Sequence, residues 1–196
     1  MKKYETKKSN VLLWLALAIF LFETLVIVGY YWLFGGYFGV ASLTISRFVG
    51  LGLASALDFG IGNTLIVILL LYYLSTHARI KYWLWHLLMV GFTGCLMALS
   101  IFPHLANDFA VARVHQIFAA IMFVVMALAG IVSLIIAQHK SAIILATLFV
   151  TFSIYFILSY ISRPDYFTQN ILFFETSYIL AFFGLTICAN SKKSQQ

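Results

Sequence analysis

Charged residues are scarce in this sequence. Only 9% of the 196 residues are Asp, Glu, Lys or Arg, whereas 63% are hydrophobic and the mean hydropathy is +1.02. A single water-soluble domain of this length cannot hide that much apolar surface in its core. The composition therefore excludes an ordinary soluble protein and predicts one that lies in a lipid bilayer.

Cysteine is also rare, with Cys95 in the third apolar run and Cys188 near the end of the last. The two positions are expected at different depths in the membrane, which argues against a disulfide between them on geometric grounds. We interpret both as small core residues. The sequence also lacks a GxxxxGK[ST] phosphate loop and a GxGxxG fingerprint, so nucleotide binding has no support.

The five histidines do not form a metal-binding motif. His104 and His115 flank a polar segment that contains Asp108, but their spacing matches no compact ligand pattern. No two histidines are expected at mid-depth on facing helices, which argues against haem. We therefore expect no metal ion and no other cofactor.

Long apolar runs are what the sequence has in abundance. A transmembrane helix needs about 20 apolar residues, and six windows approach or exceed that length: 11–34, 54–74, 83–102, 115–137, 142–161 and 171–189. These windows have the length of helices rather than of barrel strands, which predicts an all-α bundle of six transmembrane helices forming one domain over 11–189. The run 11–34 is too long for the apolar part of a signal peptide, so we expect it to be the first span.

Lysine and arginine predict the orientation of the bundle. With the N-terminus inside, nine of these cations fall on the cytoplasmic side, and three, Arg47, Arg113 and Arg163, fall outside. This asymmetry favours cytoplasmic N- and C-terminal tails, 1–10 and 190–196, in a multi-pass protein of the plasma (cytoplasmic) membrane. Most of the net charge of +6 comes from lysines in the tails, and no basic patch interleaved with aromatic residues exists, so we expect no nucleic-acid partner.

The acidic residues concentrate on the predicted outer side, where all except Glu5 are expected. A charged side chain deep in a bilayer costs about 2.5–3.5 kcal/mol on insertion scales, so Glu23 and Glu175 are expected to be protonated or to meet polar partners. We predict a polar cavity in the outer leaflet that binds a membrane lipid or a membrane-protein partner. Its predicted ligand-binding residues are Glu23, Ser46, Arg47, Asp58, Arg113, His115, Arg163 and Glu175.

Two alternative functions use some of the same residues. A small proton-coupled transporter would use Glu23 and Glu175, although the inverted repeats and broken helices typical of transporters are not evident. A membrane-embedded lipid hydrolase or acyltransferase would combine Ser46, His115 and Asp108, which are suitable types for base-activated acyl transfer. No GxSxG motif identifies the serine, so no catalytic residue is assigned and the sequence favours a binding protein over an enzyme.

Four short motifs resemble those of a known superfamily. They are SLTISRFVGLG at 42–52, SIFP at 100–103, VHQIFAAIMF at 114–123 and FFETSYIL at 173–180. In order and spacing they are similar to the six-helix superfamily of the DRAM autophagy modulators, the Sfk-type proteins and the GPI-anchor remodelling protein, which includes many uncharacterised bacterial members.

The resemblance covers nearly the whole chain and implies a link to lipids through GPI-lipid remodelling, phosphoinositide regulation and membrane asymmetry. The residues that match the superfamily's features are Ile45, Ser46, Phe102, His115 and Glu175. One departure affects the first outer loop, because relatives usually follow Ile-Ser with Asp and Gly, whereas this chain has Arg47 and Phe48.

Overall fold

The computed structural model describes residues 11–26, 29, 33, 53–77, 83–102, 109–137 and 140–190. These residues form helices, and they contain no β-strand. The helices are Val11–Val26, α3 (Leu53–His77), α4 (Trp83–Ile101), α5 (Phe109–Ile136), α6 (Lys140–Ser162), α7 (Pro164–Gln169) and α8 (Ile171–Asn190).

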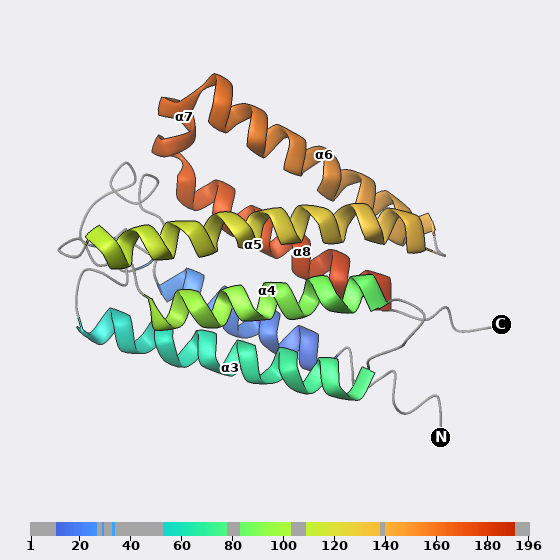
Figure 1. The fold of residues 1–196 in the computed structure, drawn as a ribbon, viewed down its shortest axis with the longest axis horizontal. Coiled ribbons are helices and arrows are strands. Elements are labelled where there is room, and N and C mark those ends of the chain that lie inside the picture. Colours follow the sequence, from blue (N-terminus) through green and yellow to red (C-terminus); the bar gives the residue numbers. More distant parts are fainter. Residues whose placement is uncertain are drawn as a thin grey trace.

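The long helices lie side by side and alternate in direction along the chain (Figure 1). Consecutive helices pack on one another, α3 on α4, α4 on α5 and α5 on α6, and α8 then packs on α6. The Val11–Val26 helix contacts α3 and α8 through its side chains. At one end of the bundle α4 and α6 end, α5 and α8 begin, and α7 lies across the tip (Figure 1). We call this end the Arg163 end.

Four helices of the described chain are long and apolar enough to cross a membrane, namely those at Trp83–Ile101, Ala110–Ile136, Lys140–Ser162 and Ile171–Cys188. Two further apolar helical stretches are shorter than these four within the described residues, namely Val11–Val26 and the part of α3 from Gly60 to Ser75. The prediction of an all-α membrane protein is therefore confirmed, with four helices of spanning length in the described part of the chain.

The start of α5 differs from the predicted window. We predicted a span from 115, whereas α5 begins at Phe109. Phe109, Ala110 and Val111 continue the apolar character of the helix, and a single arginine does not interrupt a helix because its side chain can extend toward water. Arg113 therefore lies within a helix rather than in a connecting loop.

Helix α8 is the most enclosed of the four long apolar helices. In its apolar window 44% of the residues are buried, against 22% for α6, which lies at the edge of the bundle. Its ring contacts reach Phe20 of the first helix through Phe183, and Phe92 of α4 through Phe182. Aromatic pairs of this kind stabilise close packing where lipid removes the hydrophobic driving force between helices.

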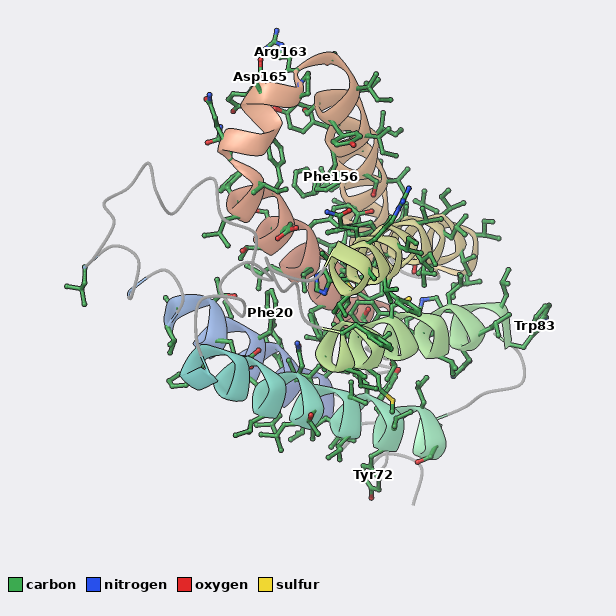
Figure 2. The ribbon with its side chains drawn as sticks, turned by 60° about the vertical axis from the view of Figure 1, so that its left-hand side comes forward. Phe20, Tyr72, Trp83, Phe156, Arg163 and Asp165 are labelled. Atoms are coloured by element: carbon green, nitrogen blue, oxygen red, sulfur yellow. The ribbon has the colours of Figure 1, made fainter. Side chains whose placement is uncertain are left out.

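Tyr178 is the centre of the contact between α8 and its neighbours α5 and α6. Its ring centroid lies 4.8 Å from that of Phe149, 5.2 Å from that of Phe156 and 5.5 Å from that of Phe123. Phe156 lies between α6 and α8, as Figure 2 shows. The Phe149 ring also packs against the backbone of α5, because a Cβ at Gly130 would lie 2.6 Å from Phe149 Cδ1.

Candidate functional site

The connection between α6 and α7 is determined by Pro164. Proline disfavours helical geometry in the residue before it, and it is well suited to the first position of a new helix. Accordingly α6 ends at Ser162, Arg163 forms the link, and α7 begins at Pro164. The backbone N–H of Arg163 still donates to the Ser159 carbonyl at 3.0 Å, which holds the arginine against the last turn of α6.

A cavity of about 250 Å³ lies at this connection. It is lined by Tyr155, Leu158, Ser159, Ser162, Arg163 and Tyr166. Tyr155, Leu158, Ser159 and Ser162 follow the i, i+3, i+4, i+7 spacing and therefore share one face of α6. Tyr166 of α7 and Arg163 complete the wall, so the cavity depends on how the chain turns after α6.

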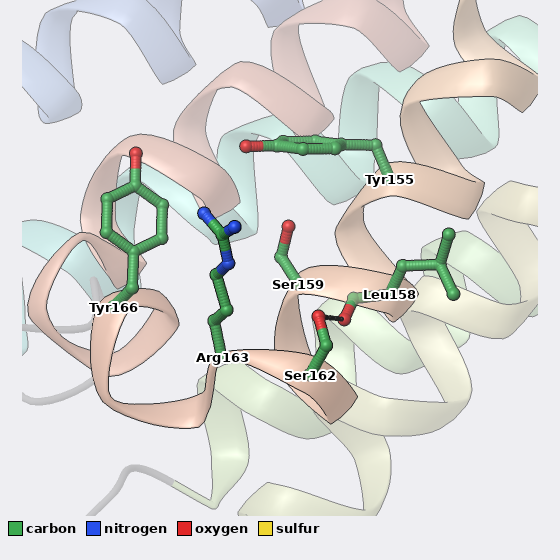
Figure 3. A pocket seen from close by; sticks show the side chains of 6 residues that line it. All are labelled: Tyr155, Leu158, Ser159, Ser162, Arg163 and Tyr166. Atoms are coloured by element: carbon green, nitrogen blue, oxygen red, sulfur yellow. Dashed lines mark hydrogen bonds between the residues drawn. The ribbon is translucent and has the colours of Figure 1, made fainter.

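Arg163 projects into this cavity. Its guanidinium group lies between the side chains of Tyr166 and Tyr155, and the Ser159 hydroxyl is on the α6 side (Figure 3). The Ser162 hydroxyl donates to the Leu158 carbonyl at 2.6 Å, which leaves its oxygen lone pairs as acceptors. The side chains of Arg163, Tyr155, Tyr166 and Ser159 carry hydrogen-bond donors, and no carboxylate lines the cavity.

Arg163 forms no ion pair with any residue in the described part of the chain. Asp165 is its nearest acidic neighbour in sequence, and both side chains lie exposed at the tip made by α6 and α7 (Figure 2). An arginine guanidinium is charged under all ordinary conditions and offers a planar set of N–H donors. The cavity is thus positively charged and suited to an anion.

His115 has a different environment in the second turn of α5. Its side chain is 4% exposed, and Nδ1 lies 2.7 Å from the Phe102 carbonyl oxygen at the end of α4. A carbonyl can only accept, so Nδ1 carries the hydrogen and donates it. The Phe102 and Phe118 rings also stack, with centroids 6.4 Å apart. His115 therefore joins the end of α4 to the start of α5.

Glu23 is buried in the first helix, three residues before Val26, with 6% of its surface exposed. Its carboxyl group packs directly on Gly62 of α3 and occupies the space that a Cβ there would need. The adjacent Asn63 is 3% exposed, and its Nδ2 has no hydrogen-bond partner among the described residues. The contact between the first helix and α3 is thus unusually polar for the interior of a bundle.

The remaining predicted site residues are dispersed. Arg113 is exposed in α5, and Glu175 is half-buried in the second turn of α8 beside the buried hydroxyl of Thr176. Asp58 precedes Gly62 by four residues in α3 and so belongs to the same helix face, but its side chain lies outside the described residues, as do Ser46 and Arg47. Arg163 is the predicted site residue that lines the α6–α7 cavity.

Our sequence reasoning missed the other five residues of that lining. The signal was present as polar residues spaced by one helical turn, Tyr155, Ser159 and Ser162, running up to the arginine. We treated 142–161 as a uniform apolar span, because a few hydroxyls hardly change the mean hydropathy of a window. In the described chain, no group of three or more His, Cys, Asp and Glu side chains could hold a metal ion.

Comparison with known proteins identifies no relative. No protein-family model, no curated protein and no solved structure matches this chain.

Proposed function

We propose that this chain is a six-span membrane protein that binds a membrane lipid at the Arg163 end. The α6–α7 cavity carries this proposal, because it presents an arginine without an ion-pair partner among the described residues at the end of apolar helices. Lipid headgroups occupy that depth of a bilayer, and arginine is the side chain best suited to their phosphates.

The distribution of ionisable residues supports the same end of the bundle. His115 and Glu175 lie in the second turns of α5 and α8, which both begin at this end. Glu23 contacts Gly62, the tenth residue of α3, and α3 begins at the same end (Figure 1). All three positions are close to the Arg163 end. Ionisable residues inside a membrane are costly and commonly belong to binding or transport sites.

The orientation follows from the positive-inside rule. Nine cations against three favour a cytoplasmic location for the opposite end of the bundle, so the Arg163 end faces the outside and its cavity meets the outer leaflet. The resemblance to the six-helix DRAM, Sfk-type and GPI-anchor remodelling superfamily, whose characterised members are connected with lipids, agrees with this proposal. A membrane-protein partner is the second occupant that the same surface could receive.

Lipid analysis of the purified protein tests the proposal. We expect native mass spectrometry of the detergent-solubilised protein to show one lipid class enriched over its share of the source membrane. Arg163→Ala should reduce that enrichment, because it removes the cationic donor. Lys140→Ala is the matched control, since it removes a cation at the opposite end of the same helix. Absence of any enriched lipid in the parent protein would contradict the proposal.

A further inference from the structure

We propose that the α6–α7 cavity holds the phosphate group of an anionic glycerophospholipid, with Arg163 as its principal ligand. This inference rests on the proposed function, because it names the chemical class of the lipid and the residues that receive it. The cavity presents five polar side chains, namely those of Tyr155, Ser159, Ser162, Arg163 and Tyr166.

The charge of the cavity selects an anion. Arg163 provides N–H donors in a planar fork that matches two phosphate oxygens at once. The hydroxyls of Tyr155 and Tyr166 flank the guanidinium group from two different helices, α6 and α7 (Figure 3). No carboxylate of the lining competes for these donors. A phosphate held here would receive charge-assisted hydrogen bonds, which are the stronger kind.

The surroundings of the cavity favour a lipid over a soluble phosphate. Leu158 lines the cavity and is 56% exposed, and Ile161 on the same part of α6 is 69% exposed, so apolar surface adjoins the polar lining. Tyr155, Tyr160 and Tyr166 are also exposed at this end of the bundle, as expected for tyrosines at the border between hydrocarbon and headgroups.

The size of the cavity fits part of a lipid. Pockets that enclose a whole drug-sized ligand usually measure about 300–1,000 Å³, whereas this one measures about 250 Å³. A headgroup phosphate would enter the cavity while the acyl chains remain along the exposed apolar side of α6. The protein then recognises the headgroup and leaves the chains in the bilayer.

The position of Arg163 also discriminates among headgroups. Two tyrosine rings could form part of an aromatic cage for a quaternary ammonium group, but here the guanidinium group stands between them (Figure 3). Its positive charge repels the choline of phosphatidylcholine. Headgroups that carry no cation, as in phosphatidylglycerol and phosphatidic acid, are the class that fits.

The test measures thermal unfolding of the full-length protein in detergent after addition of phosphatidylglycerol, phosphatidylcholine or inorganic phosphate. We expect phosphatidylglycerol to raise the unfolding temperature more than phosphatidylcholine does, and inorganic phosphate to have little effect. Arg163→Ala should weaken phosphatidylglycerol binding by about tenfold or more, the loss expected for a charge-assisted hydrogen bond. Tyr166→Phe, which keeps the ring, should weaken it less, and Lys140→Ala should not change it.

The outcomes separate this inference from the proposed function. Equal stabilisation by the two lipids would overturn the phosphate site, and the proposed function would stand if Arg163→Ala still reduces lipid enrichment. A phosphatidylglycerol effect that Arg163→Ala leaves intact would overturn both the phosphate site and the assignment of lipid binding to the α6–α7 cavity. Stabilisation by inorganic phosphate as strong as that by phosphatidylglycerol would overturn the lipid assignment. If no lipid stabilises the parent protein and none co-purifies with it, both proposals fail. Unfolding without added lipid shows whether each variant is folded.

Discussion

At the scale of single residues, the contact between Glu23 and Gly62 explains why position 62 is a glycine. The carboxyl group of Glu23 occupies the place where a Cβ at position 62 would be, and even its Cγ would lie 3.1 Å from such an atom. Any larger residue at this position must displace the glutamate or separate the first helix from α3. Gly62 is thus required because the Glu23 side chain of the first helix packs on it, and not because of the backbone geometry of α3.

We predict that Gly62→Ala destabilises the protein by about 1–3 kcal/mol, the usual cost of overfilling a packed site. The loss should be visible as a lower unfolding temperature in detergent. Gly60→Ala is the matched control, because a Cβ at Gly60 meets nothing within 4 Å. That control should be neutral or slightly stabilising, since alanine favours a helix by up to about 1 kcal/mol over glycine.

A second substitution identifies the cause. In a Glu23→Ala background the carboxyl group is gone, so Gly62→Ala should cost clearly less than it does in the parent protein. Coupling between the two positions in this double-mutant cycle is the expected sign of direct contact. Additive effects would show that Gly62 is required for some other reason.

At the scale of helices, a short chain of hydrogen bonds joins α6 to α8. The Ser153 hydroxyl donates to the Phe149 carbonyl at 2.8 Å, so its single hydrogen is already used. The Tyr178 hydroxyl, 2.7 Å away, must therefore donate to Ser153. Tyr178 needs Ser153 as its hydrogen-bond acceptor, whereas Ser153 keeps its bond to the Phe149 carbonyl even without Tyr178.

This asymmetry predicts unequal effects of the two deletions. Tyr178→Phe should cost less than about 1 kcal/mol, because Ser153 keeps its bond to Phe149 and interhelical hydrogen bonds in membranes average roughly 0.6 kcal/mol. Ser153→Ala should cost about 1–2 kcal/mol, because it leaves the buried tyrosine hydroxyl without its acceptor. Unfolding temperatures of the two variants and of the double variant provide the comparison. A larger effect of Tyr178→Phe would contradict the assigned direction of the bond.

At the scale of the whole molecule, α6 runs the length of the bundle, with Lys140 at its start and Asp165 in α7 just beyond its end. Both residues are exposed. If the Arg163 end faces the outside, these two positions lie on different sides of the membrane. Their accessibility therefore reports the orientation of the bundle directly.

We predict that a cysteine introduced by Asp165→Cys reacts with a membrane-impermeant maleimide added to intact cells. A cysteine introduced by Lys140→Cys should react only after the membrane is permeabilised. Both variants are made after Cys95 and Cys188 have been replaced by alanine, because these free thiols would add background labelling. The reverse pattern would invert the proposed topology and place the α6–α7 cavity in the inner leaflet.

The sequence by itself determined that this is a helical membrane protein and where its long helices lie. Both follow from the length and composition of apolar runs, which are properties of neighbouring residues. Helix α5 begins at Phe109, ahead of the predicted span 115–137, because a helix that emerges from a membrane can continue through a residue such as Arg113.

Only the tertiary structure decided which polar residues share a site. The cavity around Arg163 needs one face of α6 together with the turn that Pro164 imposes. The contact of Glu23 with Gly62 joins the first helix to α3 across 39 positions of the sequence. His115, predicted to bind a ligand in the polar cavity, donates one ring hydrogen to the Phe102 carbonyl at the end of α4. Hydropathy reports how deep a residue lies but not the direction in which its side chain points, and a site depends on both.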